Sequence, residues 1–190
     1  MSARGDAARR KIMDCAKQLF SQKGYGSVSM QDICAATGLS RGGLYRHYAS
    51  TAAIFTAIIN DEQNAALASL ERAVQDRVPP AKMLYTFVAS RMRRLVEGDI
   101  SFDNAVSEFA ASSEDGAELI RRRAETSIRI LGEMLRLGCE NGDFSCEDTE
   151  NAAKNILWML EGMAKHAALM PIDQFCADAQ MELIEKMIGK

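Results

Sequence analysis

The sequence has 190 residues, 47% of them hydrophobic, and a formal net charge of −3 at pH 7. This length accommodates one or two domains, each with a buried core. No apolar run approaches the roughly 18 residues of a membrane span, and the sequence does not open on a signal peptide's apolar stretch, so we expect a cytoplasmic protein. Three prolines and frequent Ala, Leu, Met, Glu and Arg favour helix throughout, which predicts an all-α fold.

The charge is unevenly distributed along the chain. Residues 1–50 contain eight Lys or Arg and three acidic residues, a net charge of +5, whereas the remainder carries −8. A basic segment suits binding to a phosphate backbone, because each Lys or Arg that neutralises a phosphate releases counterions. A plain solvated surface is the alternative explanation for the charge alone.

The five cysteines form an odd set without a CxxC pair or a neighbouring histidine, so we expect reduced thiols and no metal site. Cys15 and Cys34 fall on apolar helix faces, which favours packing over redox sensing. A redox role for Cys139 with Cys146 stays open.

Three short helices are predicted at the start of the chain. The first carries apolar residues at helical spacing from Arg9 onward and ends at Gly24. Ser29 and Asp32 resemble a capping box that opens the second helix, Met30 to about Thr37, which Gly38 ends. Ser40 caps the third helix, which runs from Arg41 to about Tyr48.

A long fourth helix begins at Ser50 or Thr51 and ends near Pro79-Pro80. It contains no Gly or Pro, so we expect a rigid lever from the basic segment into the acidic remainder. Five more helices complete a total of about nine, and the signals place them near Ala81 to Glu97, Phe102 to Ser112, Gly116 to Asn141, Glu147 to Met170 and Ile172 to Ile188.

Residues 29–48 have the pattern of a helix-turn-helix, two short helices joined by a turn that contains glycine. Gly42 and Gly43 are poor helix formers at the start of the third helix, and close approach to a DNA backbone would explain them. Arg41, Tyr45, Arg46 and His47 project from this helix as donors and flat side chains suited to base edges and phosphates.

This N-terminal pattern resembles the TetR family of repressors over about residues 9–58. The matching positions are Ile12, Ala16, Phe20, Gly24-Tyr25, Asp32-Ile33, Gly38-Leu39-Ser40 and Gly42 through Tyr48. The resemblance implies that Tyr45, His47 and Ser29 contact phosphates, while Arg41, Gly43 and Arg46 face bases. The predicted DNA-binding set is Ser29, Ser40, Arg41, Gly42, Gly43, Tyr45, Arg46, His47 and Thr51.

The sequence departs from the family pattern at two positions. Thr51 stands where the family usually has Lys, and Val28 stands where Thr is common. Loss of a lysine contact lowers the salt dependence of DNA binding by about one unit without abolishing binding.

The last two predicted helices each carry two apolar stripes, so one stripe can meet the chain's own core and the other a partner subunit. A four-helix bundle across a two-fold axis follows, and the resemblance implies the same homodimer. A larger monomer core is the alternative. The predicted interface residues are Leu160, Met163, Ala164, Ala167, Met181, Ile184 and Ile188.

The resemblance also implies a ligand site among the middle helices of each subunit. Candidate lining residues are Met83, Phe87, Arg91, Phe102, Phe109, Ile130, Met134 and Trp158, each of which can equally be plain core. His166 lies on an apolar stripe, which favours a core or interface histidine. Arg121-Arg122-Arg123 spans too much of a helix turn to form one patch.

We therefore expect a helix-turn-helix DNA-binding domain at 1–50 and a helical effector-binding and dimerisation domain at 51–190. The predicted function is a repressor that binds a near-palindromic DNA operator as a dimer and is released by a small-molecule inducer. A DNA-binding regulator without a small-molecule effector is the first alternative. An enzyme is the second, but no catalytic or cofactor motif is present, and we expect neither catalysis nor a cofactor.

Overall fold

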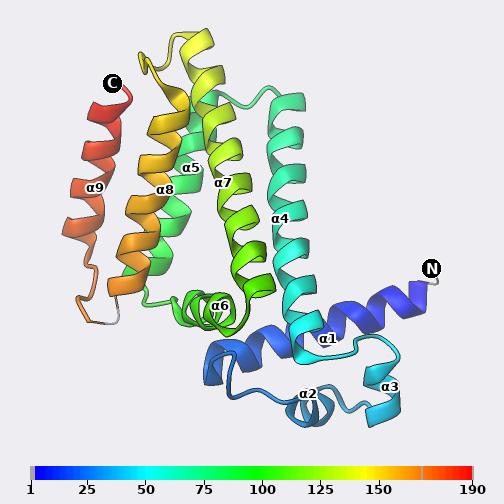
Figure 1. Ribbon diagram of the computed structural model, residues 1–190. Helices are drawn as coiled ribbons and strands as arrows, with labels where there is room; N and C mark the ends of the chain where they lie inside the picture. Colours follow the sequence, from blue (N-terminus) through cyan, green and yellow to red (C-terminus); the bar gives the residue numbers. More distant parts are fainter. Residues whose placement is uncertain (1–2, 168, 190) are drawn as a thin grey trace. The chain divides into compact units, whose positions relative to one another are not determined.

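The computed structural model describes residues 3–167 and 169–189, which form α-helices joined by short connections (Figure 1). These described residues contain no strand, and the all-α prediction is confirmed. The helices are α1 (Ala3–Lys23), α2 (Met30–Thr37), α3 (Arg41–Tyr45), α4 (Thr51–Gln75), α5 (Pro80–Val96), α6 (Ser101–Ser112), α7 (Glu114–Asn141), α8 (Thr149–His166) and α9 (Gln174–Met187).

Four helix ends differ from the sequence prediction by three residues or more. α1 begins at Ala3, six residues before Arg9, and α4 ends at Gln75, before the expected stop near Pro79. α3 ends at Tyr45 instead of near Tyr48. Past this point the His47 N–H donates to the Leu44 carbonyl, only three residues before it, which is a tighter turn than that of an α-helix. α8 ends at His166, four residues before the expected Met170. Helix ends are the least certain part of a pattern-based prediction, since the last turn depends on local hydrogen bonding.

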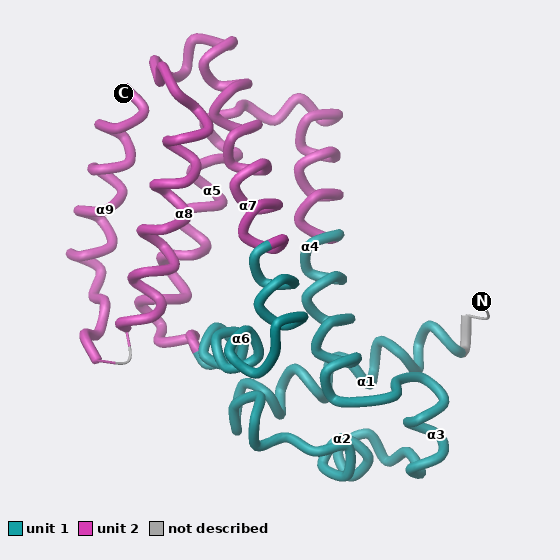
Figure 2. Tube along the Cα trace, in the orientation of Figure 1, with its two compact units in different colours: residues 1–64, 101–121 teal, residues 65–100, 122–190 magenta. Residues whose placement is uncertain are grey.

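The helices divide between two compact units (Figure 2). Unit 1 comprises residues 1–64 with 101–121, and unit 2 comprises 65–100 with 122–190. Packing therefore does not divide the chain at residue 50. α4 and α7 each contribute residues to both units. The functional division into 1–50 and 51–190 remains a prediction.

Unit 1 has a core built on aromatic rings. α6 packs against α1, although about 80 residues separate them in sequence. The ring of Phe55 lies 4.9 Å from that of Phe20 and 4.6 Å from that of Phe109, measured between centroids. Such contacts add roughly 0.5–1.5 kcal/mol beyond the area they bury. The first part of α4 is anchored in this core.

Unit 2 is a helical bundle in which α5 packs against α8 and α9. Its main core contains Leu84, Leu131, Leu135, Ile156 and Leu157, all fully buried. A second, smaller cluster is formed around Met83, Ile130 and Met134. In the later part of α4, the half-buried side chains of Leu67 and Leu70 pack against this small cluster.

Candidate nucleic-acid interface and cavity

The start of α2 is fixed by a reciprocal capping box, as the sequence predicts. The Asp32 N–H donates to Ser29 Oγ at 3.2 Å, and the Ser29 N–H donates to Asp32 Oδ2 at 2.9 Å. Lys23 Nζ also donates to Asp32 Oδ1 at 2.9 Å. The Ser29 hydroxyl donates to Asp32 Oδ2 at 2.5 Å. This bond above all, together with those from Lys23 and the Ser29 N–H, holds the pKa of the Asp32 carboxyl far below its usual range.

The turn between α2 and α3 is held from both sides. Gly38 adopts φ 72°, the left-handed conformation that suits glycine after a helix end. Thr37 is buried and its hydroxyl donates to the Ile33 carbonyl at 2.7 Å, while Lys11 Nζ of α1 donates to the Thr37 carbonyl at 2.9 Å. The turn between α2 and α3 is therefore fixed by contacts within the chain itself.

α3 buries one side chain and exposes the others. Leu44 is fully buried, whereas Arg41, Tyr45 and Arg46 are exposed, Tyr45 by 43%. The Ser40 hydroxyl accepts from the Gly43 N–H at 3.2 Å and caps the helix. The predicted reading face of α3 therefore carries two cationic guanidinium groups and a phenol in contact with solvent.

A concave surface of about 680 Å³ lies between α2, α3 and the start of α4. It brings together four of the predicted contact residues, Ser29, Arg41, Tyr45 and Thr51. Arg46, His47, Ser40 and the two glycines do not line it. Sequence reasoning missed Gln31, an exposed residue on α2 that does line it.

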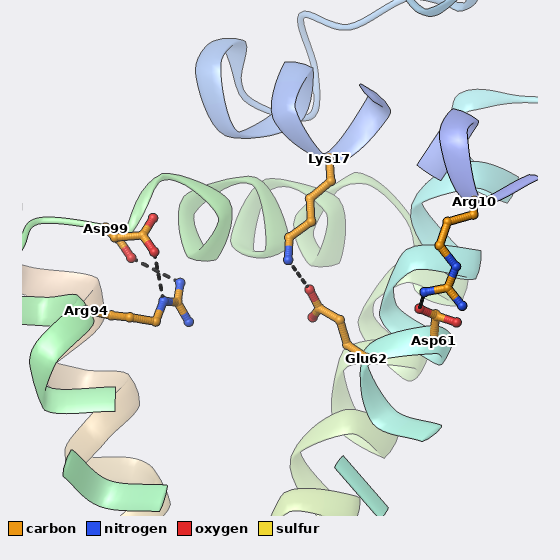
Figure 3. Close-up of polar contacts among 6 residues, drawn as sticks. All are labelled: Arg10, Lys17, Asp61, Glu62, Arg94 and Asp99. Atoms are coloured by element: carbon orange, nitrogen blue, oxygen red, sulfur yellow. Dashed lines mark hydrogen bonds and ion pairs between the residues drawn. The ribbon is translucent and has the colours of Figure 1, made fainter. Parts of the chain in front are cut away.

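Two ion pairs join side chains of α1 to side chains of α4 (Figure 3). Arg10 Nη1 lies 3.6 Å from Asp61 Oδ2, and Lys17 Nζ lies 2.7 Å from Glu62 Oε1. Both pairs are partly exposed, so each contributes at most about 1 kcal/mol. Figure 3 also shows Arg94 bonded to Asp99, which ties down the turn after α5 in unit 2.

A cavity of about 470 Å³ lies wholly within unit 2, between the later part of α4 and helices α5 and α7. Four of the predicted ligand-site residues line it: Met83, Phe87, Ile130 and Met134. Lys82 of α5 also lines it and was missed, because an exposed lysine carries no sequence signal for a cavity.

The other four predicted ligand-site residues lie elsewhere. Phe102 and Phe109 are buried in the aromatic core of unit 1. Arg91 lies with its guanidinium 5.8 Å from the Phe87 ring but does not line the cavity. Trp158 is 60% exposed on α8.

The seven predicted interface residues are all buried or half-buried within unit 2. Leu160, Ala167, Ile184 and Ile188 are buried in the main core of unit 2, and Met163, Ala164 and Met181 are half-buried beside it. The exposed apolar side chains are others, which the sequence prediction did not include: Trp158, Leu169, Met170, Phe175 and Leu183.

Three further features that the sequence singles out make local contacts within unit 1 or unit 2. His166 is exposed and its Nδ1 lies 2.9 Å from the Gly162 carbonyl. Arg121 pairs with Glu118 on its own helix. Cys139 Sγ contacts the Cys146 carbonyl at 3.6 Å, and burial raises the pKa of the Cys146 thiol, which disfavours the reactive thiolate.

No group of three or more His, Cys, Asp or Glu side chains in residues 3–167 and 169–189 is arranged to hold a metal ion. Within the same residues, no helix is both long and apolar enough to cross a membrane.

Comparison with known proteins gives consistent matches. Residues 12–58 match the family model "Bacterial regulatory proteins, tetR family". The HTH-type transcriptional regulator Rv1255c of Mycobacterium tuberculosis is 32% identical over 154 residues, which cover 70% of this chain and 76% of the relative. The HTH-type transcriptional repressor Rv1474c of the same organism is 30% identical over 130 residues, 65% of this chain and 70% of the relative.

The fold matches as well. The structure of reduced Escherichia coli NemR superimposes with a TM-score of 0.79 at 16% identity and covers 96% of this chain and 98% of that one. The fold and the family assignment confirm the resemblance at residues 9–58. The chain therefore belongs to the tetR family of bacterial regulatory proteins and is a DNA-binding transcriptional regulator, not an enzyme.

Proposed function

We propose that this regulator is a repressor that binds a near-palindromic operator as a homodimer and releases it when a small molecule binds in unit 2. The observation that carries the proposal is the concave surface of unit 1, around which Arg41 and Tyr45 of α3 lie with Ser29 and Thr51. The relative Rv1474c is named a repressor, which supports repression as the direction of control.

In this proposal two guanidinium groups read the base sequence, that of Arg41 on the concave surface and that of Arg46, which lies just after α3 and outside this surface. Neighbouring groups hold the DNA backbone. Arg41 and Arg46 each offer the paired donors that fit guanine in the major groove. Tyr45 and the Thr51 hydroxyl donate to phosphates, and the N-terminus of α2 adds its partial positive charge. The Ser29 hydroxyl donates to Asp32 Oδ2, so Ser29 serves this surface by fixing the start of α2. Because the capping bonds already fix α2, little of this geometry has to form on binding.

Dimerisation is supported by the exposed apolar side chains of α8 and α9. Phe175 is 83% exposed and Leu183 is 55% exposed on α9, and Trp158 is exposed on α8. Apolar surface of this kind on adjacent elements marks an interface. A second copy of this chain, docked through the same residues, covers them in a closed two-fold dimer. Two α3 helices that read successive major grooves would lie about 34–36 Å apart.

Ligand release is supported by the contacts of α4. Its first part is anchored in the core of unit 1 by the buried residues Ile54, Phe55, Ile58 and Ile59. Its later part lines the cavity through Ala66, Ser69, Leu70 and Ala73. A ligand that contacts these residues biases the position of α4, and ligand and operator then weaken each other's binding by the same factor.

The experiment begins with selection of DNA from a random duplex pool by the purified full-length protein. We expect enrichment of a near-palindrome with two half-sites, footprinted at a centre-to-centre spacing of about one helical turn or a multiple. The protein–DNA complex is then challenged with a library of small molecules, and at least one releases the DNA.

Two outcomes separate the parts of the proposal. Enrichment of no sequence, or of a single unpaired half-site, contradicts operator binding by a dimer. A ligand that binds unit 2 and leaves operator affinity unchanged contradicts induced release and favours a regulator without a small-molecule effector.

A further inference from the structure

The cavity in unit 2 has one polar wall, provided by α5. Lys82, Thr86 and Ser90 are spaced four residues apart, so they form one stripe along the helix, and all three are exposed. The stripe extends over eight residues, or about 12 Å of helix axis. The Ser90 hydroxyl already donates to the Phe87 carbonyl at 2.8 Å, which leaves its oxygen as an acceptor.

The floor of the cavity is apolar. Met83 on the neighbouring stripe of α5 is buried, as are Ile130 and Met134 of α7. Methionine side chains adapt their shape to irregular apolar ligands. A molecule lying along the α5 stripe therefore contacts hydrocarbon on one side over its whole length.

Small side chains of α4 leave the volume of the cavity unfilled. Ala66, Ser69 and Ala73 are small and point to the cavity at helical spacing. Larger apolar residues at these positions would join the small cluster around Met83 and fill the volume. At about 470 Å³, the cavity falls within the range of small-molecule sites.

The residues that line the cavity carry one charged side chain, and its charge is positive. Lys82 is the one ionic side chain among the residues that line the cavity, and no Asp or Glu lines it. Lys82 forms no ion pair with any residue in the described ranges 3–167 and 169–189. Its ammonium group is thus available to an anion at one end of an otherwise apolar site.

We propose that this cavity selects an apolar monocarboxylate, with the carboxylate at Lys82 and the hydrocarbon over Met83, Ile130 and Met134. This inference rests on the proposed function, because it names the class of molecule for the same cavity. A hydroxyl group at the far end of such a ligand can donate to the Ser90 oxygen.

Three probes with the same chain and different head groups test the charge. They are decanoate, decan-1-ol and decyltrimethylammonium, each titrated into the full-length protein by calorimetry below its micellar concentration. We expect decanoate to bind about tenfold more tightly than the alcohol, as a charge-assisted hydrogen bond at a partly exposed site provides. The cation binds more weakly than either.

Two variants locate the effect. Lys82→Met keeps the aliphatic stem and removes the charge, so we expect decanoate to lose its advantage over decan-1-ol. Lys154→Met is the matched control, because Lys154 is a surface lysine of unit 2 that pairs with Glu150 and does not line the cavity. Ala73→Leu fills the space and weakens all three probes; circular dichroism and the melting temperature show that each variant is folded.

The outcomes distinguish this inference from the proposed function. Equal binding of acid and alcohol to the wild type, tighter binding of the cation, or an anion preference that survives in Lys82→Met overturns the monocarboxylate assignment. An absence of decanoate binding overturns it as well. None of these results affects release of operator DNA by another compound, which the library challenge measures separately.

Discussion

Gly42 lies on exposed α3 with nothing within 4 Å of the position that a Cβ would occupy. Neither crowding nor a left-handed φ within the chain requires glycine there, although glycine costs up to about 1 kcal/mol relative to alanine inside a helix. The proposed close approach of the DNA backbone would require it. The same argument is weaker for Gly43, whose added Cβ would lie 3.2 Å from Ser40 Oγ.

Gly42→Ala is therefore expected to stabilise the free protein, or leave it unchanged, and to weaken operator binding. Chemical denaturation and fluorescence anisotropy measure the two effects. Gly132→Ala on α7 is the control, since its Cβ would lie 4.0 Å from Ala153 Cβ, at ordinary contact distance. Unchanged operator affinity in Gly42→Ala would contradict a close approach of DNA at this position.

Asp32 gives a pH-dependent prediction. Its pKa is lowered in the folded protein, so its stabilising contribution is complete above the unfolded value of about 3.9 and is lost as the pH falls through the folded pKa. Asp32→Asn should thus melt at a lower temperature than the wild type, by a constant difference from pH 7 to 5. The difference should shrink below pH 4, and a difference independent of pH would exclude the ionised carboxylate as its source.

Local signals at the residue scale were predictable from sequence, and burial was not. The capping box of Ser29 and Asp32 depends on residues three apart, so the sequence contains the whole motif. Leu160, Ile184 and Ile188 were predicted at an interface, yet they are buried in the main core of unit 2. Both stripes of α8 and of α9 are apolar, so sequence periodicity alone could not choose which stripe meets the core.

At the scale of elements, α6 shows what the sequence leaves out. The sequence predicts its bounds to within one residue but not its partner, because its packing against α1 joins segments far apart in the chain. Glu108 of α6 accepts a hydrogen bond from the Gly26 N–H at 3.1 Å. Its carboxylate also lies 2.6 Å from where a Gly24 Cβ would be, and Gly24 has φ 78°. α6 thus supports the turn between α1 and α2.

Glu108→Ala should remove this support at a cost of about 1 kcal/mol, which lowers the melting temperature by roughly 2–4 °C. Amide hydrogen exchange in residues 24–28 should accelerate as well. Glu125→Ala, an exposed acidic residue of α7, is the matched control. If residues 24–28 exchange equally fast in both variants, Glu108 does not hold the turn.

At the scale of the whole molecule, the exposed apolar side chains of α8 and α9 lead to a prediction about assembly. Leu183→Glu places a charge in the proposed interface, so we expect a monomer at micromolar concentration by light scattering and a weaker complex with the full operator. Val74→Glu is the control, because Val74 is 44% exposed on α4 and lies outside that face. A Leu183→Glu protein that stays dimeric would place the interface elsewhere.

The account of the whole molecule rests on sequence reading by α3, which two duplexes test directly. Wild type, Arg41→Ala and Arg46→Ala are titrated against the selected operator and a scrambled duplex at one salt concentration. We predict that the wild type prefers the operator and that each variant loses about 1–3 kcal/mol of that preference, roughly 5- to 150-fold. Tyr45→Phe should weaken both duplexes alike. Equal affinity of the wild type for both duplexes, or full preference in both arginine variants, would contradict the account.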